Sequence, residues 1–466
     1  MMLFAGSAHP ASMVSATNMK FSSDYLLQQL RKQPAAACYQ VAFSGGLDSH
    51  ALLHALSQLR AELNADIGAV HVHHGLQQAA DDWEAHCQRV SAELDVPYVS
   101  LGVDGKAGRG ESPEAAARSA RYAALADWLP SGDCLLTAQH QDDQAETLLL
   151  QLLRGSGVNG LAAMPGTATL GAGRHLRPLL EVSREALREY ALANRLLWIE
   201  DPSNTDVAFD RNYLRQQVLP VLRQRWPAMA ASLSRSANHC ADASHLLNDL
   251  AAQELQALVS GDHSLSLTGL AALSPSRQAN VVRHWIKQLS GKTPSTAVLA
   301  RIFNDVVASR CDAEPCVRWG SSEMRRFRGQ LYLLPRREHQ EHSSPVDWKL
   351  AESLALPQAG GVLTAIPQTG GGIRTAAVSD GQVHVAWRQG GERCRPAGRG
   401  HHHSLKNLFQ EQGIPPWERP RIPLIYIGDQ LAAVAGLWVC EPFQAGPAEP
   451  GFKINWSAGQ QSTVGG

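Results

Sequence analysis

The sequence predicts an α/β protein, in which a domain built on a parallel sheet is followed by a helical domain and a smaller α+β domain. Short β-prone runs alternate with helix-type periodicity over residues 38–165, which is typical of a parallel sheet covered by helices. The first β-prone run leads directly into a Gly-rich turn at Ser44–Ser49. Beyond about residue 228, helical patterns come first and β-prone patterns follow.

The elements of the first domain follow in chain order from these patterns. Four strands are predicted, at Cys38–Phe43, Ile67–Val72, Pro97–Val103 and Cys134–Ala138. Four helices are predicted between and after them, directly after Ser49, at Asp82–Leu94, at Ala115–Trp128 and at Asp143–Leu153. In the first helix Leu52, Leu56 and Leu59 share one face, and Ser112-Pro113-Glu114 is a typical helix start.

The remainder of the chain shows more irregular patterns. Residues 155–173 are rich in Gly, Ala and Thr and are predicted as a loop, before a short α/β tail. Helices are predicted at 228–258, Arg277–Leu289 and Val298–Ser309, a strand at Arg325–Leu334, and a helix near Ser404–Gln412. The predicted organisation is a tail at 1–30, the parallel-sheet domain at 31–220, a helical domain at 228–335, a linker with short strands at 336–379 and a C-terminal domain at 380–455.

Composition limits the classes of function. A hydrophobic share of 44% predicts folded domains, and the net charge of -1 predicts that any nucleic-acid surface depends on local clusters of Arg and Lys. The eight cysteines are scattered without a CxxC pair, so we expect reduced thiols and no zinc site. No run approaches the ~20 apolar residues that a membrane helix needs, and no signal peptide is evident. We expect a cytoplasmic protein without a membrane partner.

The hexapeptide Ser44-Gly45-Gly46-Leu47-Asp48-Ser49 predicts a phosphate site. Its glycines allow a tight turn, and the following helix start offers free N–H groups and a positive dipole end. It is not a Walker loop, because no Lys-Ser or Lys-Thr follows. Asp48 would repel phosphate unless a bridging Mg²⁺ intervenes, so we predict Asp48 as a metal ligand. The alternative is an ordinary helix cap.

This loop resembles the signature of the N-type ATP pyrophosphatase, or PP-loop, family, which implies ATP cleavage between the α and β phosphates and a strand order of 3-2-1-4-5. His140-Gln141-Asp142-Asp143-Gln144-Ala145-Glu146-Thr147 and Arg154-Gly155-Ser156-Gly157-Val158-Asn159-Gly160-Leu161 resemble a second signature, that of tRNA(Ile)-lysidine synthases. That family is expected to carry His where this chain has Gln139, and His140 is the candidate to replace it. The C-terminal run Ile414-Pro415-Pro416-Trp417-Glu418-Arg419 also resembles the family.

The resemblance implies a two-step reaction with ATP, Mg²⁺, free L-lysine and an isoleucine tRNA with a CAU anticodon. Asp143 and Glu146 share a helix face and are predicted to bind lysine and act in catalysis with Asp48 and Arg121. A capping box with Asp143 as the cap and Glu146 three residues later is the structural alternative. Predicted ATP ligands are the six loop residues Ser44, Gly45, Gly46, Leu47, Asp48 and Ser49, together with His74, Arg118 and Gly155.

Basic residues outside the loop region are predicted to bind tRNA phosphates. They are Arg211, Arg215, Arg326, Arg395, Arg399, Lys406 and Arg419. Trp417, which lies among them, is expected in a core. Two alternatives stay open: another PP-loop tRNA-modifying ligase, or a catalytically inactive tRNA-binding protein. The sequence also leaves a homodimer open.

Overall fold

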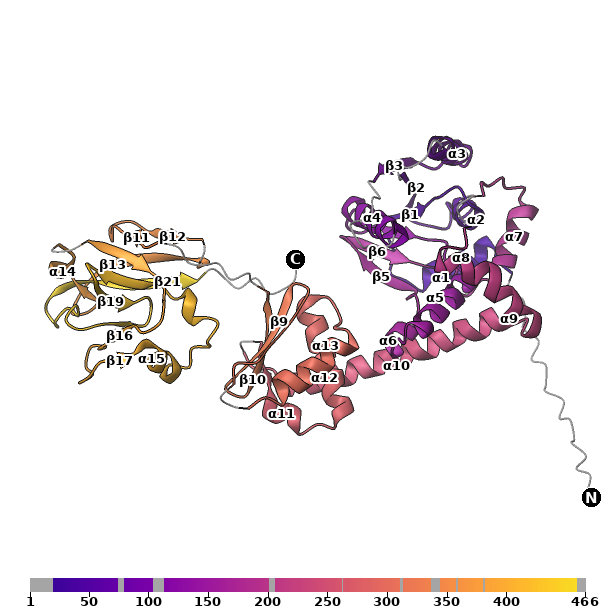
Figure 1. Ribbon diagram of the computed structural model, residues 1–466. Helices are drawn as coiled ribbons and strands as arrows, with labels where there is room; N and C mark the ends of the chain where they lie inside the picture. Colours follow the sequence, from indigo (N-terminus) through magenta and orange to yellow (C-terminus); the bar gives the residue numbers. More distant parts are fainter. Residues whose placement is uncertain are drawn as a thin grey trace, which may run out of the picture. The chain divides into compact units, whose positions relative to one another are not determined.

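The computed structural model describes residues 20–73, 79–103, 113–200, 206–261, 263–310, 313–336, 344–357, 359–379 and 382–458 (Figure 1). The chain divides into two compact units, residues 1–247 and 248–466. Each unit has its own cores and is described by itself below. Among the described residues, no helix is both long enough and apolar enough to cross a membrane.

The first unit is built on a six-stranded sheet with the order β3-β2-β1-β4-β6-β5. Its strands are β1 (Cys38–Ala42), β2 (Asp66–His73), β3 (Tyr98–Gly102), β4 (Cys134–Leu136), β5 (Thr167–Leu170) and β6 (Gly173–Leu176). All neighbours pair in parallel except β5, which runs antiparallel to β6. The implied order 3-2-1-4-5 is therefore confirmed with β6 as the fifth parallel strand, and β5 is an added edge strand.

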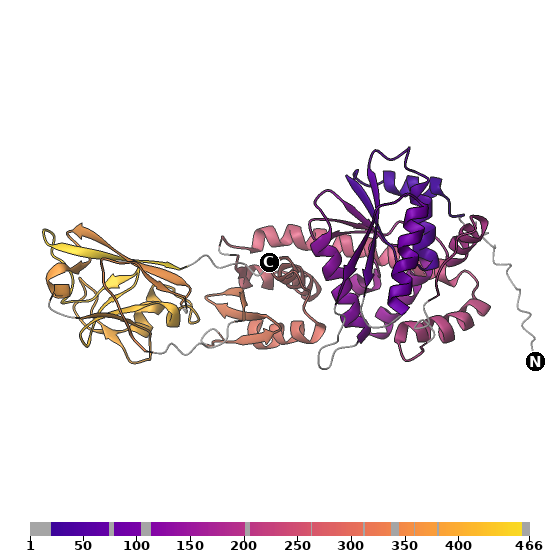
Figure 2. The same cartoon turned by 90° about the horizontal axis from the view of Figure 1, so that it is seen from above.

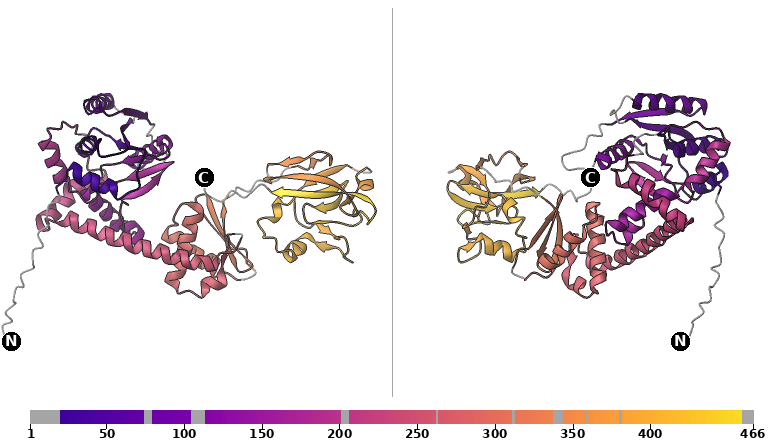
Figure 3. Two further views of the ribbon diagram at one scale, coloured as in Figure 1. Left: turned by 180° about the vertical axis from the view of Figure 1, so that it is seen from behind. Right: turned by 45° about the vertical axis from the view of Figure 1, so that its right-hand side comes forward.

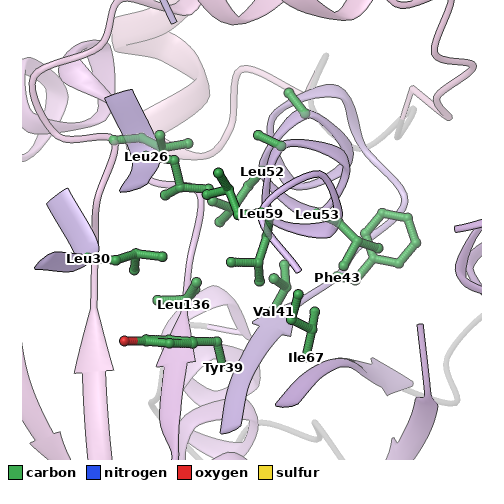
Figure 4. Close-up of a cluster of buried hydrophobic side chains, with 14 of the residues drawn as sticks. Leu26, Leu30, Tyr39, Val41, Phe43, Leu52, Leu53, Leu59, Ile67 and Leu136 are labelled. Carbon is green, nitrogen blue, oxygen red and sulfur yellow. The ribbon is translucent and has the colours of Figure 1, made fainter. Parts of the chain in front are cut away.

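Helices cover both faces of this sheet (Figure 2). One face carries α1 (Ser23–Arg31), α2 (Leu47–Ser57), α3 (Ala79–Glu93) and α7 (Arg184–Ala193), and the other carries α4 (Pro113–Trp128). The period-2 alternation of strand side chains produces the two layers, because Val41 and Leu136 enter the core under α2 whereas Val70 and Leu135 pack with α4. Figure 4 shows the first of these cores.

Two predictions for this unit are wrong. The tail predicted at residues 1–30 overlaps helix α1, which buries Leu26 and Leu30 against the sheet, as Figure 4 shows. The predicted loop at 155–173 contains α6 (Val158–Leu161) and strand β5. Both are short elements whose stability comes from tertiary packing, so local pattern alone does not identify them.

A continuous helical segment then leads out of the sheet. It comprises α8 (Asp210–Tyr213), a π-helical turn at Leu214–Val218 and α9 (Leu219–Arg225), before α10 (Met229–Leu258). Ala145 of α5 (Gln141–Leu153) packs with Leu219 and Met229 in a small core of its own. This contact holds the helical segment against α5, which carries the predicted catalytic carboxylates.

The second unit begins with helices and a four-stranded antiparallel sheet, so the domain predicted as helical is α+β. The helices are α11 (Leu267–Ala271), α12 (Pro275–Ser290) and α13 (Thr296–Arg301), which continues as a π-helical turn at Ile302–Val307. The sheet has the order β7-β10-β9-β8, from β7 (Leu265–Ser266), β8 (Cys316–Trp319), β9 (Ser322–Phe327) and β10 (Gln330–Pro335). The single strand predicted at Arg325–Leu334 is a hairpin, because Arg328 and Gly329 adopt positive φ and turn the chain.

The C-terminal part of this unit consists of antiparallel sheets (Figure 3). Its longest pairing joins β13 (Gly361–Thr369) to β21 (Pro450–Ala458). The remaining elements are β11 (Val346–Asp347), β12 (Leu354–Leu356), β14 (Ile373–Arg374), α14 (Thr375–Ser379), β15 (Val383–Ala386), β16 (Arg393–Cys394), β17 (His403–Ser404), α15 (Leu405–Glu411), β18 (Leu424–Ile427), β19 (Gln430–Val434) and β20 (Trp438–Val439). The stretch predicted as a linker, 336–379, thus supplies four strands to this fold.

One cysteine pair departs from the sequence prediction. Cys394 and Cys440 form a disulfide with a Cα–Cα distance of 5.8 Å, in the core under α15. The expectation of reduced thiols fails for these two residues. They are 46 positions apart, and only the fold of the C-terminal sheets brings them together.

Candidate active site

The phosphate loop lies where the sequence predicts it, between β1 and the first turn of α2. Gly46 is the N-cap of α2, and Asp48 stands in the first helical turn. The Ser44 N–H donates to Ser49 Oγ at 3.3 Å, and the Ser49 hydroxyl donates to the Gly46 carbonyl at 3.1 Å. The loop therefore ties itself into a closed turn at the positive end of a helix, which is a suitable site for an anion.

Gly45 occupies a position in the loop that a residue with a side chain fits poorly. Its φ is +78°, in the left-handed region that favours glycine. A Cβ at this position would lie 3.1 Å from Cys87 Sγ and 3.3 Å from His86 Cδ2, both on α3. The Gly45 carbonyl also accepts a hydrogen bond from the Ile199 N–H at 3.0 Å. The loop is thus held from two sides by parts of the chain that are distant in sequence.

His140 joins the phosphate loop to the second motif. Its Nε2 atom lies 3.6 Å from Asp48 Oδ2 and 3.4 Å from Asp143 Oδ2, and its side chain is only 3% exposed. Burial opposes protonation of this imidazole, but Asp143 and Asp48 outweigh it and raise the pKa of His140 to about 9. His140 is therefore a buried cation between Asp48 and Asp143, and its substitution for the histidine that the family carries at position 139 stays a prediction.

Glu146 has a different environment from the other acids of the site. Its side chain is 1% exposed and accepts hydrogen bonds from Arg215 Nε at 2.7 Å and from Arg215 Nη2 at 2.9 Å. Arg211 Nε lies 3.2 Å from the same carboxylate, and Arg215 also reaches Asp143 Oδ1 at 3.2 Å. Arg211 and Arg215 stand four residues apart on the helical segment, so both side chains reach one face of α5.

Arg211 and Arg215, which the sequence predicts to bind tRNA, are paired with buried carboxylates in this structure, and their contact with tRNA stays a prediction. A buried carboxylate needs cationic partners, and these two guanidinium groups supply them for Glu146. The π-helical turn that contains Arg215 is a feature often found at functional sites. The sequence indicated both arginines as functional candidates, and the structure shows that their acidic partners lie on α5.

The cluster is balanced in charge. Three acids, Asp48, Asp143 and Glu146, face three bases, His140, Arg211 and Arg215. Burial would raise the pKa of Asp143, but His140 and the two arginines hold it below its usual value. Burial raises the pKa of Glu146, against the opposing effect of Arg215. The two carboxylates of α5 thus have different environments, because Asp143 faces His140 as well as the arginines, whereas Glu146 faces the arginines alone.

The capping-box alternative for Asp143 and Glu146 is wrong in register. The N-cap of α5 is His140, and the His140 N–H donates to Asp143 Oδ2 at 3.0 Å. Asp143 is thus the third residue of the helix and satisfies its first turn, while Glu146 has no capping role. Asp143 serves the helix start and the ion-pair cluster at once.

One oxygen of Asp48 is suited to a hard divalent cation, although the described residues contain no group of three or more His, Cys, Asp or Glu side chains that could hold a metal ion by themselves. Asp48 Oδ1 is buried, and no hydrogen-bond partner for it exists among the described residues. An unsatisfied carboxylate oxygen at the mouth of a phosphate loop is the ligand that Mg²⁺ prefers, with nucleotide phosphates completing its coordination. Mg²⁺ as the bound ion stays a prediction.

The structure separates the other predicted ATP ligands. Arg121, which is predicted as catalytic rather than as an ATP ligand, adds to the effect of burial in lowering the pKa of His71, and His71 Nδ1 lies 2.9 Å from the Phe43 carbonyl just before the loop. Arg118 instead lies over the ring of Tyr122 at 5.1 Å. His74 lies outside the described residues. Gly155 follows the C-terminal end of α5 with a φ of +68°, about 18 Å along the helix from Asp143, so it ends the helix rather than joining the loop.

The basic residues predicted for tRNA binding in the second unit are mostly paired. Arg326 donates to the carbonyls of Val307 and Ser309, and Arg419 is 6% exposed and donates to the Ile414 carbonyl. These two guanidinium groups bind backbone carbonyls of their own domains, and their contact with tRNA stays a prediction. Arg395 pairs with Glu441 at 2.6 Å and Arg399 with Glu411 at 2.7 Å, while Lys406 is exposed. Trp417, expected in a core, is half-buried against Phe327 and Tyr332.

Comparison with known proteins agrees with this architecture. Family models match a PP-loop domain at residues 19–222, the TilS substrate binding domain at 265–332 and the TilS substrate C-terminal domain at 383–456. The tRNA(Ile)-lysidine synthase of Coxiella burnetii is 44% identical over 434 residues, which cover 93% of this chain and 96% of the relative. The enzyme of the same name from Methylococcus capsulatus is 44% identical over 422 residues, 90% of this chain and 96% of the relative. A crystal structure of a TILS C-terminal domain aligns at 22% identity with a TM-score of 0.21, covering 25% of this chain and 96% of that chain.

The sheet order, the closed anion loop and the acidic residue within it define a PP-loop enzyme that uses ATP. The relatives extend this class over nearly the whole chain, through both later domains. The chain belongs to the tRNA(Ile)-lysidine synthase family.

Proposed function

We propose that this enzyme attaches free L-lysine to C2 of the wobble cytidine in an isoleucine tRNA with a CAU anticodon, at the expense of ATP. Family membership supports the reaction class. The observation that carries the assignment of residues is the continuous cluster from the phosphate loop through His140 to Asp143 and Glu146. An anion site and an ammonium site would then lie next to each other.

In the first step, cytidine O2 attacks the α-phosphorus of ATP and pyrophosphate leaves. The amides at the start of α2 would hold the departing phosphates, and the Ser44 and Ser49 hydroxyls would add hydrogen bonds. When bound at Asp48, Mg²⁺ would neutralise charge that develops on the leaving group. His140 keeps Asp48 in place through its charged imidazole. Arg121 of α4 would add positive charge near the loop, which is supported by its electrostatic effect on His71.

In the second step, the lysine side-chain amine attacks C2 of the adenylated base and AMP leaves. A free lysine ammonium has a pKa near ~10.4, so it must lose a proton before it can attack. Asp143, whose pKa is lowered, would hold the ammonium as a carboxylate, and Glu146, whose pKa is raised, would take the proton. Both roles follow from burial and neighbouring charge rather than from residue type alone.

The arginines on these carboxylates set a condition for lysine binding. Arg215 already bridges Glu146 and Asp143, and the cluster is neutral as it stands. An ammonium that enters this cluster must take over hydrogen bonds that Arg215 or Arg211 now makes. The arginine that is released would then be available to the phosphate of the adenylate.

The test is incubation of the protein with ATP, free lysine and a CAU-anticodon tRNA(Ile) transcript, followed by mass analysis of the nucleosides. We expect a cytidine heavier by one lysine less water, and equal amounts of AMP and pyrophosphate. A matched transcript with uridine at the wobble position is the control and should give no product. AMP release with a different modified nucleoside would indicate another PP-loop ligase, and no AMP at all would indicate an inactive RNA-binding protein. A homodimer stays a prediction that gel filtration can address.

A further inference from the structure

A second group of basic side chains lies at the same edge of the sheet as the phosphate loop. Strands β1, β4 and β6 run in parallel, so Ser44, Thr137 and Arg177 all follow the carboxyl ends of their strands. The Thr137 N–H donates to the Leu176 carbonyl at 3.1 Å, which keeps β4 and β6 in register at this edge. Arg177 is two strands from the loop, or about 10 Å at the usual spacing.

Tyr122 of α4 is the centre of this group. The Arg118 guanidinium lies over its ring, with Cζ 5.1 Å from the centroid. The ring centroids of His175 and Tyr122 are 5.7 Å apart, and Arg177 interacts electrostatically with Tyr122. Arg177 is itself positioned by a hydrogen bond from Nη1 to the Pro165 carbonyl at 2.8 Å.

The group carries positive charge without a matching acid. Within the part of the chain that the structure describes, no carboxylate forms an ion pair with Arg118 or Arg177, and Arg177 Nε is buried without a hydrogen-bond partner. Burial lowers the pKa of His175 to about 3, so this histidine is neutral and contributes no charge of its own. Arg118 and Arg177 differ in this respect from Arg211 and Arg215, which are paired with a buried carboxylate. Two arginines beside one tyrosine thus form an incomplete site that requires an anion.

We propose that Arg118 and Arg177, with Tyr122 between them, bind a backbone phosphate of the RNA substrate next to the nucleotide that is modified. The anion could come from ATP or from RNA, since both carry phosphate. The position favours RNA, because the helix start at β1 already accommodates the nucleotide phosphates and this site lies two strands further along the edge. An aromatic ring beside two arginines is also typical of RNA contacts. The choice of RNA rests on the proposed function.

The experiment compares Arg177→Ala, Arg177→Lys and Arg118→Gln with wild type. Arg188→Gln is the matched control, because Arg188 is exposed on α7, on the opposite face of the sheet. Equilibrium binding of the tRNA transcript is measured at several salt concentrations, and ATP binding is measured separately without tRNA. Thermal melting shows whether each variant folds, and Arg177→Lys keeps the charge should the alanine variant be unstable.

We expect Arg177→Ala and Arg118→Gln to weaken tRNA binding about tenfold or more at low salt and to reduce the salt slope by about one. The ATP affinity of each variant should stay within twofold of wild type. The tRNA affinity of Arg177→Lys should lie between those of wild type and Arg177→Ala. A tenfold loss of ATP affinity would assign the group to the nucleotide and overturn the proposal, as would unchanged tRNA affinity in folded variants. Lysidine formation by the wild-type protein, measured in parallel, separates failure of this site from failure of the proposed function.

Discussion

Replacement of Glu146 by glutamine tests the proposed lysine site most directly. The carboxylate is 1% exposed and accepts two hydrogen bonds from Arg215, at 2.7 and 2.9 Å, with Arg211 at 3.2 Å. Glutamine keeps the shape of the side chain and removes its charge. A hydrogen bond to a charged group is worth about 1.5–3 kcal/mol, which corresponds to a rise in the lysine KM of roughly 10- to 150-fold.

The same substitution has a cost in stability that must be measured beside the kinetics. Loss of one partner of a buried ion pair costs up to about 3–5 kcal/mol, and we expect the lower end because Asp143 still pairs with Arg215. For a unit of this size, about 3 kcal/mol lowers the melting temperature by roughly 6–12 °C. The assay therefore varies lysine at saturating ATP and tRNA, well below the melting temperature of the variant.

The two possible roles of Glu146 give different results. If Glu146 binds lysine, its KM rises far more than the ATP KM, whatever the change in melting temperature. If Glu146 only neutralises the arginines, the melting temperature falls while the lysine KM stays within twofold of wild type, and our reasoning is refuted. Glu189→Gln is the control, because Glu189 is exposed on α7 and should change neither quantity.

Three further predictions follow from the loop and from the disulfide. Gly45→Ala should raise the ATP KM at least tenfold in initial-rate assays, because the position has a positive φ and the added Cβ would meet Cys87. Gly166→Ala is the control and should leave the ATP KM unchanged, since its added Cβ would meet open space. Equal ATP KM values for the two variants would show that the loop tolerates a side chain. Asp48→Ala should abolish AMP release while tRNA binding in a gel-shift assay survives, and retained AMP release would remove Asp48 from catalysis. Reduction of the disulfide between Cys394 and Cys440, or its replacement by two alanines, should lower the free energy of unfolding of the second unit by about 2–4 kcal/mol in urea titrations, and an unchanged midpoint would mean that the bond is not formed.

The sequence determined those features that depend on neighbours in the chain. The strand, Gly-rich turn and helix start at Ser44–Ser49 are consecutive, so their local geometry follows from backbone freedom and helix capping. The parallel sheet likewise follows from alternating periodicities that were readable over residues 38–165. The placing of Asp143 and Glu146 on one helix face needed only their spacing.

Tertiary structure decided the partners of these residues. Arg215 is 69 positions from Glu146, and the same basic residue could equally have faced RNA until the fold buried Glu146 beside it. The sequence likewise suggested Arg419 as a surface residue that binds RNA, but its side chain is buried in its domain and donates to the Ile414 carbonyl. Charge, burial and distance act through space, so a residue type and its neighbours in sequence do not fix which opposite charge it will meet. Local sequence motifs identify the residues of the site, whereas the fold determines which of their charges are paired.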